Sequence, residues 1–352
     1  MEAGLKENLI MKSLYSYAVD GEVKCILGTH VDDILWVCQP EAQHLVDEAK
    51  KRFVWGKEEK NNFRYCGKDV VTEADGTIRV SCKATILKTN PISIDKGRRN
   101  LDLVTNDERT QLKSVAGSLS WVARQCRPDL SYRVSKLQSA AGPKCSVKDL
   151  KEANKVLEYA ISTADRGLTF RGGILDWNTM VSGVITDASH GSETEYLPKI
   201  ESVEEHRSQG ARLNVLATPS LLAGEECHFH VISHASTIVK RVCRSTVQAE
   251  TYSIQAGVEE GDKLRAAVAD LEGLLDHKQW DASAAKSMRQ VWLTDCKSAE
   301  QALTRATLAK ISDKRLGIEI ASLRQSLWRA PGESEGNPHV EDERPEHATD
   351  IV

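Results

Sequence analysis

The order of apolar segments in the second half of the chain constrains the fold most. Four stretches have the short apolar runs typical of strands: 180–187, 212–217, 228–240 and 290–295. Three stretches have the periodic apolar stripe of a helix: 246–270, 297–309 and 314–328. Three strands, a helix, a strand and further helices predict an α/β fold with a mixed sheet. We expect the first three strands to be antiparallel and the 290–295 strand to lie beside the first.

The first half of the chain is organised differently. Two short apolar runs, Val23–Leu27 and Ile34–Cys38, lie on either side of a polar centre and predict a hairpin. Residues 106–165 are mostly helical in pattern, with a break before Pro128 because proline disfavours helix at the preceding residue. A Gly-rich joint at 171–173 then leads into the second half. The chain therefore divides into three predicted domains: 1–95, 96–175 and 176–352.

Composition narrows the class of protein. The net charge of −4 means that any nucleic-acid binding would depend on local basic patches. The nine cysteines are odd in number, scattered and without a CxxC pair, which favours reduced thiols in an intracellular protein, cytoplasmic or nuclear. We expect no membrane span, because no window of about 18 residues is continuously apolar.

Three carboxylates lie in predicted apolar stripes. Residues two apart on a strand share a face, so Asp187 continues the face of Ile185 and Asp295 continues the face of Leu293. Glu250 falls in the inward stripe of its predicted helix. We expect Asp187 and Asp295 to meet at neighbouring strand ends, facing the core, with Glu250 above them.

Such a group of acids indicates a bound cation. An unpaired buried carboxylate costs several kcal/mol, and no lysine stands at a matching spacing. Mg²⁺ prefers oxygen ligands, and two such ions about 3.5–4 Å apart can activate a water and stabilise the leaving oxygen of a phosphodiester. For any one of these acids alone, the alternative is a turn former or a helix N-cap.

A series of motifs follows in one order along the chain: His30-Val31-Asp32-Asp33, Phe63-Arg64-Tyr65-Cys66-Gly67, Gly117–Trp121, Arg127–Tyr132, Thr186–Ser189, Ser245–Tyr252 and Thr294–Ala299. Together they resemble the C-terminal part of Pol polyproteins of copia-type retrotransposons, where the end of a reverse transcriptase precedes a ribonuclease H. The first motif is similar to the polymerase motif Tyr-Val-Asp-Asp, with His30 replacing the aromatic residue. The last three are similar to ribonuclease H motifs of that family.

The resemblance implies specific roles. Asp187, Glu250 and Asp295 match ribonuclease H acids that hold two Mg²⁺ ions and hydrolyse RNA in RNA–DNA hybrids. Asp32 and Asp33 match the adjacent polymerase aspartates. The three domains become a reverse transcriptase palm remnant (1–95), a helical connection (96–175) and a ribonuclease H-like domain with an acidic tail (176–352). The expected partners are an RNA–DNA hybrid and the rest of a Pol polyprotein.

Two departures from the family pattern stand out. The family's polymerase takes a third aspartate and its fingers from upstream, and only 31 residues precede Asp32; we expect no polymerase activity from this chain alone. The family's fourth ribonuclease H acid lies in Ala-Asp-x-Leu-Thr-Lys, which Ala348–Val352 matches only in part. Asp350 is the candidate for that fourth catalytic acid, and Glu319 is a second candidate.

Two smaller groups allow alternatives. Lys240, Arg241 and Arg244 are candidates for phosphate contacts, or else a solvated strand end. Cys227, His228, His230 and His234 lack a recognised zinc spacing, so we expect a polar strand face. For the whole chain, the alternatives to a ribonuclease H are a catalytically inert transposon remnant and a module that binds nucleic acid without cutting it.

Overall fold

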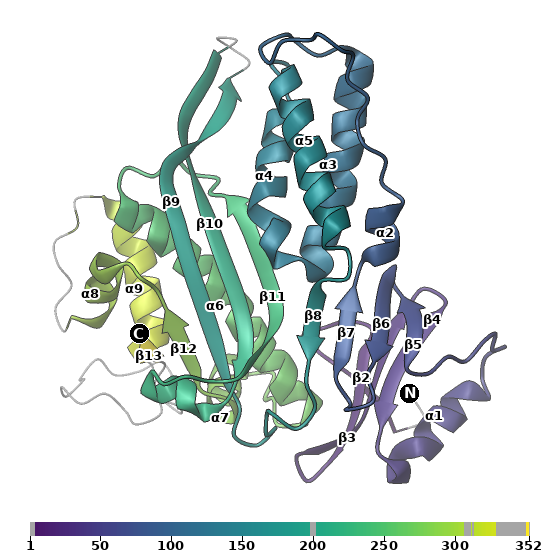
Figure 1. The fold of residues 1–352 in the computed structure, drawn as a ribbon. Coiled ribbons are helices and arrows are strands. Elements are labelled where there is room, and N and C mark those ends of the chain that lie inside the picture. The colour runs from purple at the N-terminus through teal and green to yellow at the C-terminus, as the bar shows by residue number, and fades with distance from the viewer. Residues whose placement is uncertain (1–3, 198–201, 306–310, 312, 329–349, 352) are drawn as a thin grey trace.

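A computed structural model describes residues 4–197, 202–305, 311, 313–328 and 350–351. These described residues form three sheets, two of four strands and one of five, together with helices that pack against them (Figure 1). The predicted mixed α/β fold class is therefore confirmed. Nothing in the described structure fixes the domain limits, so the division at 95 and 175 stays a prediction.

The N-terminal sheet has the order β1-β2-β3-β4, and all its pairs are antiparallel. Its strands are β1 (Lys6–Glu7), β2 (Leu14–Val19), β3 (Glu22–His30) and β4 (Asp33–Cys38). A 3-10 turn (Pro40–Ala42) and α1 (Gln43–Lys50) follow β4, and their buried side chains pack with Cys25 and Leu27. The predicted hairpin is confirmed as β3 and β4.

The middle sheet, of order β5-β6-β7-β8, is antiparallel throughout. Three of its strands are consecutive: β5 (Asn62–Tyr65), β6 (Lys68–Thr72) and β7 (Ile78–Ser81). The fourth, β8 (Gly167–Phe170), arrives only after the helices. A segment of the predicted helical connection thus completes a sheet begun in the predicted palm remnant.

Between β7 and β8 lies a cluster of helices (Figure 1). Its members are α2 (Lys83–Leu87), α3 (Asn106–Cys126), the 3-10 turn Pro128–Leu130, α4 (Ser131–Ala140) and α5 (Val147–Ser162). Thr105 begins α3 with a capping box, since its side chain accepts from the Glu108 N–H and the Glu108 carboxylate accepts from the Thr105 N–H. The predicted helical segment and its break before Pro128 are confirmed.

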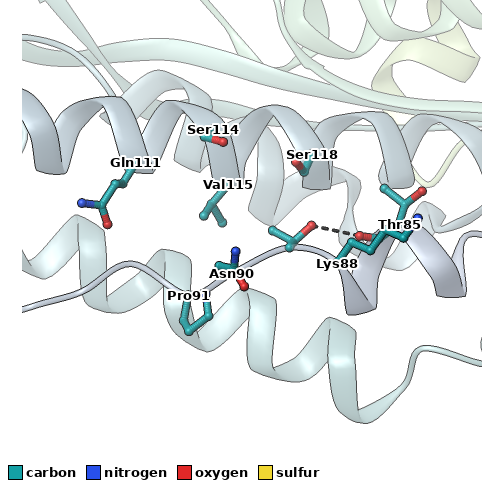
Figure 2. A pocket seen from close by; sticks show the side chains of 9 residues that line it. Thr85, Lys88, Asn90, Pro91, Gln111, Ser114, Val115 and Ser118 are labelled. Carbon is teal, nitrogen blue, oxygen red and sulfur yellow. Dashed lines mark hydrogen bonds between the residues drawn. The ribbon is translucent and has the colours of Figure 1, made fainter.

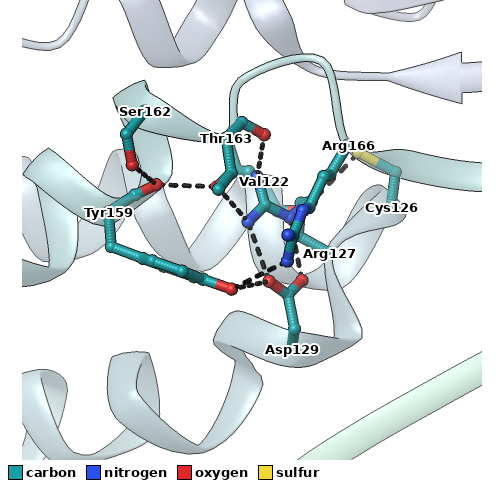
Figure 3. Close-up of polar contacts among 8 residues, drawn as sticks. All are labelled: Val122, Cys126, Arg127, Asp129, Tyr159, Ser162, Thr163 and Arg166. Carbon is teal, nitrogen blue, oxygen red and sulfur yellow. Dashed lines mark hydrogen bonds and ion pairs between the residues drawn. The ribbon is translucent and has the colours of Figure 1, made fainter.

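Arg127 ties this break to the end of α5 (Figure 3). Its side chain is 1% exposed and donates two 2.8 Å hydrogen bonds to the Asp129 carboxylate. It also donates to the carbonyl oxygen and hydroxyl of Thr163, at 3.0 and 2.8 Å. A buried guanidinium needs such partners, so the network fixes how α3 turns into α4.

The C-terminal sheet has the order β11-β10-β9-β12-β13. Its strands are β9 (Val181–Leu197), β10 (Ser202–Ala217), β11 (Phe229–Ile238), β12 (Gln290–Leu293) and β13 (Asp350–Ile351). The first three strands are antiparallel, and β12 lies beside β9 and parallel to it. Both expectations for this sheet are confirmed, although β9 and β10 extend well beyond the predicted strands (Figure 1).

Helices and one turn surround this sheet. They are a 3-10 turn (Pro219–Ala223), α6 (Thr246–Leu271), α7 (Trp280–Ser287), α8 (Lys297–Thr304) and α9 (Lys314–Trp328). α6 lies across β9 and β10 (Figure 1). One buried cluster joins β9, α6, β12 and α9, and it includes Val184, Ile254, Trp292 and Ile320. Within the described ranges, no helix has both the length and the apolar character needed to cross a membrane.

The helical cluster also touches the C-terminal sheet. The Tyr132 hydroxyl donates to the Glu193 carboxylate at 3.1 Å, and Gln209 donates to the Ser135 hydroxyl at 3.2 Å. The His234 ring lies 2.7 Å from the Ala123 carbonyl oxygen. α4 thereby packs beside β9 and β11.

Candidate metal centre

The strand register brings two of the predicted acids to one level of the C-terminal sheet. β12 pairs with β9 so that Leu293 lies opposite Ile185. Continued two residues beyond this pair, the same register sets Asp295 beside Asp187. Glu250 arrives from α6, whose first residue is Thr246.

The three carboxylates converge. One oxygen from each of Asp187, Glu250 and Asp295 lies within 4.8 Å of the others. Among the described residues, this is the one group of three or more His, Cys, Asp or Glu side chains with such spacing. The convergence predicted from strand and helix faces is therefore present in the fold.

Two features of the prediction were wrong. Asp187 does not end its strand, because β9 continues to Leu197 through pairing with β10. Asp187 and Asp295 are exposed, and only Glu250 is buried, with 3% of its surface accessible. The alternation rule identified the shared face correctly, but the core no longer covers that face at the level of the acids.

Glu250 is the electrostatically unusual member. The backbone N–H of Ala188 donates to its Oε1 at 3.2 Å, whereas its buried Oε2 has no hydrogen-bond partner. Burial, with a smaller contribution from the charges of Asp187 and Asp295, raises the pKa of Glu250 to about 7, against the opposing Ala188 hydrogen bond. The ionised form of Glu250 is therefore poorly compensated by its surroundings, a condition that a bound cation would relieve.

These residues fit a divalent cation. All the donor atoms are carboxylate oxygens, which hard cations such as Mg²⁺ prefer. The unpartnered Oε2 of Glu250 supplies a lone pair in a buried position. Two exposed acids beside it leave an open side from which a charged substrate can approach.

The predicted basic residues lie near the start of α6, and all three are exposed. The Arg241 guanidinium lies 3.2 Å from the Glu319 carboxylate and over the Tyr252 ring. The backbone N–H of Arg244 donates to Gln248 at 2.7 Å, which leaves its guanidinium at the surface. The placement suits phosphate contacts and equally suits a solvated surface.

The two candidates for a fourth acid occupy different places. Glu319 is on α9 and pairs with Arg241, outside the three-acid group. The backbone of Asp350, in β13, pairs with that of Val291 in β12, and Val291 lies four residues before Asp295. The other residues of the predicted acidic tail, 333–349, lie outside the described residues.

The polymerase-like pair, Asp32 and Asp33, lies at a tight turn near the N-terminus, far in sequence from the three acids. β3 ends at His30 and β4 begins at Asp33, so Val31 and Asp32 form a two-residue loop. Val31 has a positive φ of 53°, a conformation that a β-branched residue adopts rarely. An open hollow of about 520 Å³ lies beside this loop, and Arg64 also lines it.

A second hollow, of about 360 Å³, lies between the 85–91 segment and α3 (Figure 2). Its lining consists of hydroxyl, amide and apolar side chains with one cation: Thr85, Lys88, Thr89, Asn90, Pro91, Gln111, Ser114, Val115 and Ser118. It contains no carboxylate, so it is no candidate for a hard metal ion.

The histidine strand has the predicted polar character. The ring of His230 accepts from the Arg171 N–H at 3.1 Å, while His234 contacts the Ala123 backbone. These rings serve separate backbone groups, and burial lowers the pKa of His230. In the described part of the chain, neither joins a group with metal-binding spacing.

Sequence reasoning missed the residues that seat α6 on the sheet. The Ser253 hydroxyl shares its one proton between backbone oxygens of β9 and β10, and Gly257 and Gly261 continue the same helix face. A Cβ on Gly257 would lie 2.7 Å from side-chain carbons of Val184 and Thr186. The sequence does contain a sign of this close packing, because Ser253, Gly257 and Gly261 are small residues spaced four positions apart.

No protein-family model matches the chain, and no curated protein matches it. One solved structure with a partly similar fold is the foamy viral protease-reverse transcriptase in complex with an RNA/DNA hybrid. The two chains are 12% identical with a TM-score of 0.41, and the match covers 81% of this chain and 32% of that one. The chain thus spans about a third of the length of that protein.

Proposed function

We propose that this chain is the C-terminal part of a copia-type Pol polyprotein and that its C-terminal sheet carries a ribonuclease H-type endonuclease. The substrate would be the RNA strand of an RNA–DNA hybrid. One observation carries the proposal: carboxylates from β9, α6 and the end of β12 converge to within 4.8 Å, and the most buried of them has an unpartnered oxygen. The sheet order and the position of α6 agree with the arrangement expected from the resemblance.

Each acid would have a distinct part. The Ala188 N–H orients Glu250 through Oε1, and the unpartnered Oε2 would be the oxygen that holds an ion. The exposed carboxylates of Asp187 and Asp295 would face the scissile phosphate. Two Mg²⁺ ions, when bound by these acids, would supply an activated water and stabilise the leaving oxygen. Lys240, Arg241 and Arg244 would hold flanking phosphates, and contacts to the 2′-hydroxyl would select RNA.

The proposal assigns no polymerase activity to this chain alone. Asp32 and Asp33 lie on the β3–β4 turn, and within the described residues no third acid joins them in a metal-binding group. Nucleotide addition by the same metal chemistry requires more ligands than an adjacent pair at a hairpin supplies.

A cleavage assay tests the proposal. An end-labelled RNA annealed to DNA is incubated with the full chain and Mg²⁺, beside the single-stranded RNA and the RNA duplex. We expect internal cuts in the hybrid alone, and loss of at least about 10²-fold in rate for Asp187→Asn. Asp107→Asn, an exposed change on α3, serves as the matched control.

Two other outcomes would favour the alternatives. Equal and metal-independent signal from the wild-type chain and Asp187→Asn would support an inert transposon remnant. Hybrid binding that weakens steeply with salt, without any Mg²⁺-dependent cutting, would support a binding module.

A further inference from the structure

The hydroxyl of Ser253 connects α6 to both strands beside the metal centre. Ser253 lies three residues after Glu250 and is 4% exposed. Its Oγ is 3.0 Å from the carbonyl oxygen of Asp187 and 2.9 Å from that of Ala211. Asp187 and Ala211 are direct partners in the β9–β10 register. One hydroxyl therefore fixes the helix against the sheet at the level of a candidate ligand.

Close packing leaves this contact little freedom. On β10, a Cβ added to Gly210 would lie 3.2 Å from the Ser253 Oγ, so glycine gives the hydroxyl its room. One helical turn further, Gly257 would meet Val184 and Thr186 at 2.7 Å if it carried a Cβ. The row formed by Ser253, Gly257 and Gly261 thus lets α6 lie close against the sheet, and Ser253 is its member nearest to Glu250 in the sequence.

The separation of the carboxylates makes this seating important. Two oxygens on opposite sides of one Mg²⁺ can be at most about 4.2 Å apart, given metal–oxygen distances of about 2.1 Å. The three carboxylate oxygens lie within 4.8 Å of one another, a distance slightly larger than one ion can span, so the acids have no separation to spare. A small outward shift of α6 would carry Glu250 out of reach of an ion held by Asp187.

We infer that Ser253 is a positioning residue for the metal centre. Its hydroxyl holds the Asp187 backbone against α6, while the Ala188 N–H holds the Glu250 carboxylate on the same helix. Ser253 itself donates to backbone oxygens and takes no part in the chemistry. The inference rests on the proposed metal-binding function and adds a residue that determines how tightly the ion is held.

Calorimetric titration of the full chain with Mn²⁺ alone, without nucleic acid, provides the test. We expect Ser253→Ala to raise the Mn²⁺ dissociation constant by about 10-fold or more, the usual effect of losing an outer-shell contact. Ser182→Ala is the matched control, because Ser182 is likewise a buried serine, but it lies at the start of β9 and its hydroxyl accepts from Gln290. We expect it to leave the constant unchanged. In the cleavage assay, Ser253→Ala should need more Mg²⁺ yet approach the wild-type rate at saturation.

A second variant reaches the same contact from the other side. Gly210→Ala places a methyl group against the Ser253 hydroxyl and should also weaken Mn²⁺ binding. If both changes act through one contact, the double variant should be no worse than the poorer single variant.

The outcomes separate the two claims. Mn²⁺ binding by Ser253→Ala equal to that of the wild type, or an equal loss in Ser182→Ala, would overturn the positioning role even if the wild-type chain cleaves hybrids. A wild-type chain that neither binds Mn²⁺ nor cleaves would overturn the proposed function and this inference together.

Discussion

Ionisation of Glu250 should make the stability of the metal-free protein depend on pH. Its pKa is raised from 4.5 to about 7, first by burial and then by Asp187 and Asp295. Since each pKa unit corresponds to about 1.4 kcal/mol, ionising Glu250 costs the folded state roughly 3 kcal/mol. Between these values the folded chain keeps a proton that the unfolded chain has lost. The stability contribution is therefore complete below the unfolded pKa of 4.5 and is lost as pH rises through about 7.

Glu250→Gln removes the charge and keeps the shape, so it isolates this effect. In EDTA, the free energies of unfolding of wild type and variant should be similar near pH 5. At about pH 8 the variant should be more stable by roughly 3 kcal/mol. Urea denaturation at both pH values measures the difference, with the exposed Glu158→Gln as control. Added Mg²⁺ should stabilise the wild type and not the variant.

One result would refute this reasoning. If wild type and Glu250→Gln lose stability in parallel between about pH 5 and about pH 8 in EDTA, the Glu250 carboxylate is not desolvated as the fold implies. The titration of other groups, such as His230, is common to both proteins and cancels in the comparison.

Three further predictions concern other parts of the molecule. Gly257→Ala should destabilise the fold by about 1–3 kcal/mol in urea denaturation, because overpacking against Val184 outweighs the gain in helix propensity; an unchanged midpoint would contradict it. Asp129→Ala should lower the free energy of unfolding by about 3–5 kcal/mol, since it leaves the buried Arg127 charge unpaired; a loss near zero would show that the hydrogen bonds to Thr163 are enough to hold Arg127. Arg244→Ala should lower the salt slope of hybrid affinity by about 1, and an unchanged slope would remove it from the interface.

The sequence allowed much of the C-terminal sheet and the candidate site to be predicted. Strand alternation placed Asp187 and Asp295 on matching faces, and helical spacing placed Glu250 toward the sheet. These rules depend only on backbone geometry, which the structure follows. The parallel register of β12 against β9 then brings the acids together. The polymerase roles of Asp32 and Asp33, the role of Asp350 and the domain limits stay predictions.

Other features of the fold could not be predicted from the sequence. The extensions of β9 and β10 carry mostly polar residues, so they show no apolar alternation, and only their mutual pairing reveals them. β8 and the short α7 lie in segments to which the sequence pattern assigned no element, and tertiary pairing decides the structure of β8. Burial of Glu250 but not of Asp187 depends on how far α6 covers the sheet, which periodicity alone does not specify.

The most direct test of the metal centre is an anomalous difference map from crystals of the full chain grown with Mn²⁺ and an RNA–DNA hybrid. We expect peaks within about 2.5 Å of carboxylate oxygens from Asp187, Glu250 and Asp295, with two ions about 4 Å apart. A map without a peak between these three side chains, at Mn²⁺ concentrations that support cleavage, would contradict the assignment of this site.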